Sequence, residues 1–200
     1  MLVLTNGNLA SCSDDKTVMI WNTTDGNLVK TLTGHTDRVR SMLELPNEDL
    51  VSCSDDKNII IWSINDSTIK KKLIGHTDKV RSLILLPGDD NEEGVHFASK
   101  SWDGSIIIWN SNDGRIRSKL TGHNGKVKSF IVLSNGDIAS GSDDKTIIVW
   151  NRKNSAIRKQ LIGHSGSVNS LILLPNGDLA SCSSDNLIII WNLSYNNLKN

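Results

Sequence analysis

Serine, histidine and aspartate, the residue types of a hydrolytic triad, recur at fixed spacing along this 200-residue chain. A triad needs an exposed serine that is activated by the histidine and lies beside an oxyanion hole. The strained G-x-S-x-G turn that presents such a serine in many hydrolases is absent from the sequence. The constellation also occurs four times, whereas an active site is normally built once. We therefore interpret these residues as structural, since a buried polar group left unpaired costs about 1–3 kcal/mol.

The spacing is that of an internal repeat. Five of the six tryptophans end segments of the form Ser-x-Ser-x-Asp-x-x followed by three apolar residues and Trp, at separations of 41, 47, 41 and 41 residues. Gly-His pairs follow the same period and lie at residues 34–35, 75–76, 122–123 and 163–164. Such a period indicates one supersecondary unit that has been copied along the chain.

Each copy predicts four short strands. Apolar or alternating runs of strand length are separated by turn residues, among them an Asn-Gly pair, the strongest short-range hairpin signal. Turn signals every eight to twelve residues favour an all-β architecture. In the copy from 122 to 162 the predicted strands are 127–133, 138–142, 146–150 and 156–161.

The third and fourth strands of the copies differ in character. The third strands hold three consecutive apolar residues, as at 59–61, 147–149 and 188–190, which leaves no solvent face and predicts a sheet covered on both sides. A sheet in each repeat that is buried on both faces by neighbouring sheets is typical of the blades of a propeller. The fourth strands carry basic residues, as at 70–72 and 158–159, which suit an exposed edge that must not pair with another chain.

Together, the Gly-His pairs, the Ser-x-Ser-x-Asp segments and the final Trp resemble the WD-repeat (WD40) β-propeller family over essentially the whole chain. The resemblance implies an all-β propeller of four-stranded antiparallel blades, with about five repeats here as part of a larger, seven-bladed propeller. In that family a His, a strand Ser, a turn Asp and a strand Trp form a hydrogen-bonded relay within each blade. The implied relays are His35, Ser52, Asp56 and Trp62; His76, Ser99, Asp103 and Trp109; His123, Ser140, Asp144 and Trp150; and His164, Ser181, Asp185 and Trp191.

The domain prediction is a single propeller region over 1–200. Its repeats are 1–33 (partial), 34–74, 75–121, 122–162 and 163–200, the last with a truncated fourth strand. The opening copy has Ser11, Asp15 and Trp21 but no relay His. We expect a segment of a longer protein; a tightly closed five-bladed ring and a propeller combined from two chains are the alternatives.

Composition narrows the function classes. Lys and Arg number 22 and Asp and Glu also 22, so no net charge draws the chain to nucleic acid or an anionic membrane. No signal peptide and no apolar run of about 20 residues is present. The three cysteines occupy equivalent repeat positions and are interpreted as small buried thiols in a reducing compartment. We therefore expect a cytoplasmic or nuclear protein with no cofactor.

Two segments break the repeat. The acidic loop 88–94 accounts for the spacing of 47 residues; it lacks the Asp-x-Asp-x-Asp-Gly order of a calcium loop and is interpreted as a solvated loop. Trp102 stands where other copies have Asp14, Asp55, Asp143 or Ser184. In the family this turn faces the top of the propeller, where peptides dock.

Cations at the neighbouring strand starts complete the predicted binding face. An exposed Trp surrounded by Arg and Lys is a plausible hot spot, and mutual pairing of the charges is the alternative. Counting nearby carboxylates leaves a local charge of about +1, which argues against nucleic acid. The predicted protein-binding residues are Arg38, Arg40, Asp55, Lys79, Arg81, Trp102, Lys126, Lys128 and Asp143.

The predicted function is that of a non-catalytic scaffold that binds proteins or peptides, including acidic segments, through the top face. Self-association through open terminal blades is a further expectation, and binding to nucleic acid or membranes is not expected. The alternative is a WD-repeat appendage of a larger enzyme, ATPase or ubiquitin-ligase-type protein whose other domain lies outside these residues. No P-loop, metal cluster or unique catalytic set is present in the sequence.

Overall fold

The computed structural model describes residues 1–88 and 94–193, and the chain divides into two compact units. The first unit comprises Met1–Ser101 and Ile107–Ser118, and the second comprises Trp102–Ile106 and Lys119–Asn200. All regular structure in the described residues is β-strand, which confirms the all-β prediction. No helix there is long and apolar enough to cross a membrane. Most of the predicted acidic loop 88–94 and the predicted truncated strand near the C-terminus lie outside the described residues.

The strands form five sheets, which we call blades 1 to 5. Blades 1 and 2 are β1 (Leu2–Val3), β2 (Leu9–Cys12), β3 (Thr17–Trp21) and β4 (Leu28–Thr33), then β5 (Val39–Glu44), β6 (Leu50–Ser54), β7 (Ile59–Ser63) and β8 (Thr68–Leu73). Blade 3 is β9 (Val80–Leu85), β10 (His96–Ser101), β11 (Ile106–Asn110) and β12 (Ile116–Leu120). Blades 4 and 5 are β13 (Val127–Val132), β14 (Ile138–Ser142), β15 (Ile147–Trp150) and β16 (Ile157–Leu161), then β17 (Val168–Leu173), β18 (Leu179–Ser183) and β19 (Ile188–Trp191).

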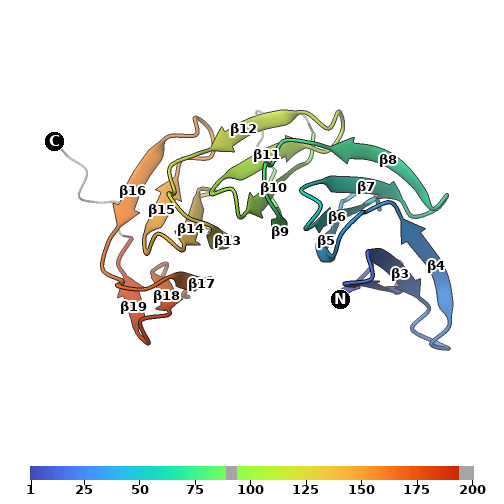
Figure 1. The fold of residues 1–200 in the computed structure, drawn as a ribbon, viewed down its shortest axis with the longest axis horizontal. Helices are drawn as coiled ribbons and strands as arrows, with labels where there is room; N and C mark the ends of the chain where they lie inside the picture. The colour runs from blue at the N-terminus through green and yellow to red at the C-terminus, as the bar shows by residue number, and fades with distance from the viewer. Residues whose placement is uncertain (89–93, 194–200) are drawn as a thin grey trace. The chain divides into compact units, whose positions relative to one another are not determined.

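Within a blade, consecutive strands lie side by side. In blade 4 the pairs β13–β14, β14–β15 and β15–β16 are all antiparallel, and Figure 1 shows this order from β13 to β16. The predicted Asn-Gly turn joins β13 to β14, and Gly136 there has a φ of 82°, a conformation that glycine adopts without strain. The predicted four-stranded antiparallel blade is thus confirmed.

Burial of the third strands depends on the blade. Every residue of β7 and of β15 is buried, as the apolar triplets predict. In β19, however, Ile188 and Ile190 are 75% and 63% exposed, so the prediction of burial on both faces is wrong there. The reason is that β19 alternates between two faces, and among the described residues only one of those faces packs on another sheet, that of blade 4.

Neighbouring blades pack through their apolar faces. In the first unit Val51 and Ile61 of blade 2 share a core with Phe97 and Trp109 of blade 3.

Within blade 2, the glycine of the Gly-His pair is required by its close packing against the tryptophan of the same blade. A Cβ added to Gly34 would lie 2.7 Å from Ile69 Cδ1 and 3.0 Å from Trp62 Cη2. Only glycine lets the loop approach the tryptophan so closely.

The fourth strands lie at exposed edges, and their basic side chains also hold neighbouring turns. Lys70 Nζ lies 2.6 Å from Asp49 Oδ1 in the same blade, with 46% of the lysine side chain exposed. Lys71 Nζ donates a hydrogen bond to Asn112 O in blade 3 at 2.7 Å. These cations therefore stabilise turns in addition to marking an edge.

Candidate functional site

The Ser, His, Asp and Trp of blade 4 form one chain of hydrogen bonds. Trp150 Nε1 donates to Ser140 Oγ at 2.7 Å, and Ser140 Oγ lies 2.8 Å from His123 Nε2. His123 Nδ1 lies 2.8 Å from Asp144 Oδ2. A carboxylate can only accept hydrogen bonds, so Nδ1 carries a proton and a neutral imidazole accepts the Ser140 hydroxyl at Nε2. Every polar atom in this chain then has a partner.

The same geometry recurs in other blades. His35 and His164 contact an Asp through Nδ1 and a Ser through Nε2, at 2.7 to 2.9 Å. In blade 3, His76 Nε2 and Trp109 Nε1 each lie 2.8 Å from Ser99 Oγ. The remaining residues in these arrangements are Ser52, Asp56 and Trp62 in blade 2 and Ser181, Asp185 and Trp191 in blade 5. In the opening copy Trp21 Nε1 donates to Ser11 Oγ at 2.8 Å.

Hydrogen bonds keep the relay carboxylates ionised. Burial alone raises the pKa of Asp56, but donors outweigh it: His35 and the backbone N–H groups of Thr36 and Asn58 hold that pKa well below its usual range. The pKa of Asp144 is lowered in the same way, against its own burial, by Thr146, His123 and Asn124. The relay aspartates therefore act as acceptors that join the Gly-His loop to the turn before the third strand.

Burial of the relay serines bears on the hydrolase alternative. Ser52, Ser99 and Ser140 are 0% exposed, and Ser181 is 2% exposed. Each already receives a hydrogen bond from a tryptophan. A nucleophile must reach its substrate, and these four serines have almost no exposed surface from which to do so.

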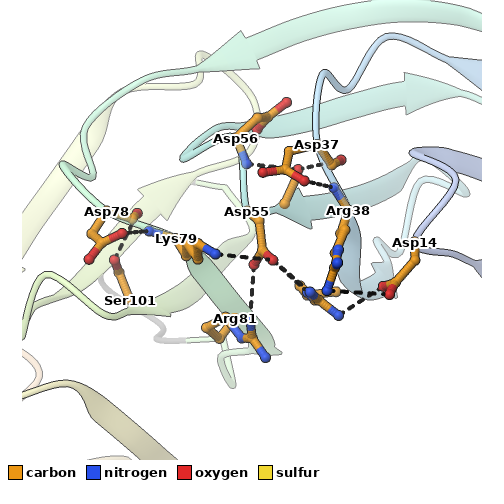
Figure 2. Close-up of polar contacts among 11 residues, drawn as sticks. Asp14, Asp37, Arg38, Asp55, Asp56, Asp78, Lys79, Arg81 and Ser101 are labelled. Atoms are coloured by element: carbon orange, nitrogen blue, oxygen red, sulfur yellow. Dashed lines mark hydrogen bonds and ion pairs between the residues drawn. The ribbon is translucent and has the colours of Figure 1, made fainter.

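A charged cluster centred on Asp55 lies where the turns meet the strand starts in the first unit. The Asp55 N–H donates to Arg38 O at 2.9 Å, which fixes the turn beside the start of β5. Arg40 Nε and Nη2 donate to Asp55 Oδ2 at 3.0 and 2.6 Å. Arg81 Nη1 donates to Asp55 Oδ1 at 3.0 Å (Figure 2). Lys79 Nζ lies 3.8 Å from Oδ2. The Asp55 side chain is 1% exposed and is enclosed by these cations.

The cations reverse the effect of burial on Asp55. Burial by itself raises the pKa of this carboxyl, but the Arg40 hydrogen bond and the charges of Arg81, Arg40 and Lys79 bring the pKa below its ordinary value. The same interactions raise the pKa of Arg40, chiefly through its hydrogen bond to Asp55. The cluster is therefore a network of ionised groups.

Asp14 extends the cluster into blade 1. Arg40 Nη1 donates to Asp14 Oδ1 at 2.9 Å, and Arg38 Nη1 lies 3.5 Å from Asp14 Oδ2. Asp14 and Arg38 are 63% and 54% exposed at the side chain. Asp37, by contrast, accepts the backbone N–H of Arg38 at 2.8 Å (Figure 2). Arg40 thus joins the turns of two blades, each through a carboxylate.

In the second unit the equivalent positions are occupied differently. Trp102 is partly buried rather than exposed, and Lys126 Nζ lies over its ring, 4.1 Å from the centroid. The prediction of an exposed tryptophan is therefore wrong, because the lysine of the following blade covers the ring. Lys128 Nζ lies 3.4 Å from Asp143 Oδ1. Many charged residues of the predicted binding face thus form ion pairs with one another, which agrees with the alternative interpretation of mutual charge pairing.

Acidic residues in the turns before the second strands were missed by the sequence reasoning. Asp49 binds Lys70, and Asp137 binds Arg158 Nε at 2.5 Å. The available signal was an Asn two residues earlier, at Asn47 and Asn135, since Asn-x-Asp in a turn predicts a side-chain contact. The Asn-x-Asp pattern does not, however, predict which cation on the fourth strand binds the aspartate, Lys70 or Arg158.

Metal and thiol chemistry find no support in the part of the chain that the structure describes. No group of three or more His, Cys, Asp or Glu side chains there could hold a metal ion. The cysteines are unpaired; Cys53 is buried, while Cys12 and Cys182 are half-buried. Burial raises the pKa of the Cys53 thiol, which keeps it protonated.

Comparison with known proteins identifies the repeat. The family model described as "WD domain, G-beta repeat" matches residues 4–22, 26–63, 67–110, 114–151 and 155–192. The chain belongs to the WD40 repeat family. A search of curated proteins by sequence found no significant match.

Solved structures agree with this family. The crystal structure of the WD40 beta propeller domain of Doa1 is 30% identical in sequence, with a TM-score of 0.74 over 94% of this WD40 chain. The match spans 62% of the length of that structure. Because 1448 chains of solved structures match, the fold alone does not select one function. WD40 propellers generally serve as protein-interaction scaffolds and are typically non-catalytic.

Proposed function

We propose that this WD40 chain is a non-catalytic scaffold for protein or peptide segments, and that the Asp55 cluster receives an acidic one. The observation that carries the proposal is the convergence of Arg40, Lys79 and Arg81 around the enclosed carboxylate of Asp55. Arg38 lies beside them and pairs with Asp14. Arg40 and Arg81 lie on β5 and β9 of neighbouring blades, and Arg38 and Lys79 directly precede those strands, so a rigid scaffold positions all four.

The layering of charge favours an acidic ligand. Asp55 is the inner layer, at 1% exposure, whereas the side chains of Arg38 and Lys79 are 54% and 38% exposed. A ligand approaching this surface meets Arg38 and Lys79, with the exposed Asp14 beside Arg38, before it meets Asp55. Complementary charge of this kind speeds association and selects partners more than it raises affinity.

Pairing within the cluster supports a peptide over a nucleic acid. Asp14 and Asp55 neutralise part of the positive charge, and the chain as a whole has no net charge. Nucleic-acid binding draws most of its affinity from unneutralised Lys and Arg. Patterned charge instead suits a segment whose carboxylates lie at defined positions.

In the second unit we propose Trp102 and Lys126 as a further contact. Tryptophan is one of the residue types that often contribute most of the binding energy at interfaces. The Trp102 ring is partly buried and lies under the Lys126 ammonium group. The ring is already positioned, so little conformational entropy is lost when a ligand contacts it.

The test titrates the chain with a fluorescent Glu-rich peptide and follows anisotropy. Arg38→Glu should slow association and weaken binding several-fold, because Arg38 is the most exposed cation of the cluster. Arg115→Glu is the matched control, since Arg115 is 86% exposed and pairs with Asp113 in its own turn. Equal binding by both variants and the parent chain would overturn the assignment, as would binding of single-stranded DNA in place of the peptide.

A further inference from the structure

The chain contains four Asn-Gly pairs, and this is the dipeptide in which an asparagine amide is most readily lost. The backbone nitrogen of the residue after asparagine can attack the side-chain carbonyl carbon, and glycine hinders that attack least because it has no side chain. All four asparagines are exposed, so exposure does not distinguish them. They are Asn6, Asn124, Asn135 and Asn176.

Three of the pairs lie in turns that hold the glycine nitrogen. The N–H groups of Gly7, Gly136 and Gly177 donate to leucine carbonyls three residues earlier, at 2.9 Å. The nitrogen must give up its proton before it attacks, so the reaction breaks this hydrogen bond. At Asn135 the amide is held as well, since Nδ2 donates to Asp137 Oδ2 at 2.8 Å. These turns therefore oppose loss of the amide.

The fourth pair, Asn124-Gly125, lies in the Gly-His loop of blade 4 and is not held in this way. Among the residues that the structure describes, neither the Gly125 N–H nor the Asn124 side chain has a hydrogen bond. The loop is anchored by the Asn124 backbone N–H, which donates to Asp144 Oδ2 at 2.9 Å. The reaction does not consume that group, so both reacting groups are available while the loop stays folded.

The other blades have no amide at this position. The equivalent residues are Thr36, Thr77 and Ser165. The N–H groups of Thr36 and Ser165 donate to the relay aspartate at 2.9 Å, as that of Asn124 does. The anchoring hydrogen bond therefore does not require asparagine, and the sequence combines an amide with a following glycine here in blade 4 alone.

We propose that Asn124 is a site of spontaneous deamidation, which converts the Gly-His loop of blade 4 to an aspartyl or isoaspartyl form. The Gly125 nitrogen bonds to Asn124 Cγ, its proton passes through water to Nδ2, and Nδ2 leaves as ammonia. Water then opens the cyclic imide and restores the N–H, at Cγ to give aspartate or at the backbone carbonyl to give isoaspartate. Overall one water replaces one ammonia, with no oxidant or cofactor. The site does not depend on peptide binding at the Asp55 cluster.

The product should weaken the relay of blade 4. Either form carries a new carboxylate near Asp144, which is ionised, and like charges repel. The isoaspartyl form also lengthens the backbone before Gly125. A Cβ added to Gly125 would lie 2.8 Å from Asp144 N, so the loop has little room there for additional atoms. We therefore expect the modified chain to have a lower melting temperature.

The test incubates the folded chain in mildly alkaline water labelled with heavy oxygen and quantifies label in each Asn-Gly peptide by mass spectrometry. Asn124 should convert about ten-fold faster than Asn135, which equals about 1.4 kcal/mol and is the size of effect that hydrogen bonds at Asn135 supply. In the urea-denatured chain the two rates should agree within a few-fold, because only the folded turn protects Asn135. Equal rates in the folded chain, or slower conversion of Asn124, would overturn the proposal.

Asn124→Ser is the matched variant, since serine occupies this position in blade 5. It should remove the label from this peptide and abolish the decline in Tm that the parent chain shows on prolonged incubation. Asn135→Ser, at the protected pair of the same blade, should leave that decline in place. A decline that persists in Asn124→Ser would overturn the proposed effect on the relay.

Discussion

Asp55 in blade 2 and Asp143 in blade 4 occupy the same repeat position but lie in different environments. The Asp55 side chain is 1% exposed and contacts three cations, whereas that of Asp143 is 29% exposed and pairs with Lys128 at 3.4 Å. The backbone of the two turns is the same: each aspartate N–H donates to the carbonyl of a strand-start residue, at 2.9 and 3.0 Å. Backbone structure therefore does not explain the difference.

One part of the difference lies within the blade, where Arg40 donates two hydrogen bonds to Asp55 and the corresponding Lys128 forms a single ion pair with Asp143. The other part comes from the following blade. Asp55 receives Arg81 from blade 3, but the residue of blade 5 that corresponds to Arg81 is Asn169, and it donates to Ser184 Oγ instead. A repeat position thus acquires part of its charge environment from the next copy. The relay, by contrast, draws all its members from one blade and its Gly-His loop, and it has the same geometry in blades 2, 4 and 5.

The largest effect is expected from removing the enclosed carboxylate. Asp55→Ala removes the buried acceptor that Arg40 and Arg81 share and should lower the free energy of unfolding by about 3 kcal/mol. Asp143→Ala, at the exposed equivalent, should cost less than about 1 kcal/mol. Urea denaturation of both variants measures the difference. Equal losses would show that the following blade does not determine the environment of this turn.

The relay should respond alike in the two units. His35→Ala and His123→Ala each leave a buried serine and an ionised aspartate short of a partner, at a cost of about 2 kcal/mol. Thermal unfolding should show similar decreases in Tm for both, with peptide affinity at low temperature within a few-fold of the parent. A variant with unchanged stability and abolished binding would argue against a structural role.

Acid should destabilise the chain through the same carboxylates. The pKa values of Asp55 and Asp56 are lowered in the folded state, so their contribution is complete above the unfolded pKa of about 3.9. It is lost as the pH falls from there through the folded values. Urea midpoints at pH 5 and pH 3 should therefore differ less for Asp55→Asn than for the parent chain. An undiminished acid loss in that variant would contradict the ionised network.

The smallest effect is expected at Trp102. Trp102→Ala removes the contact with Lys126 and should cost about 0.5–1 kcal/mol from the loss of the cation–π interaction. Trp102→Asp places there the residue type of other copies and should retain more stability by pairing with the same lysine. Chemical denaturation of the two variants compares them. A more stable alanine variant would show that Lys126 is not the partner that matters.

The sequence predicted the relay residue by residue because the interaction is local to one repeat. His123, Ser140, Asp144 and Trp150 all lie within one period, and the motif spacing was sufficient to group them. For the cation cluster, the sequence predicted which residues lie on the same face but not which cation pairs with which carboxylate. The pairing of Arg81 with Asp55 spans 26 residues and two blades, and nothing in either repeat alone specifies it.

By itself the sequence determined the number of copies, the strands within each and the members of each relay, because these follow from a period and from short-range patterns. Only the tertiary structure decided that Asp55 is enclosed, that Lys126 covers Trp102 and that one face of β19 stays exposed. These features depend on which side chains neighbouring sheets bring together. Burial and charge pairing arise where neighbouring sheets pack together, and the sequence of one repeat does not specify which side chains the next repeat places against it.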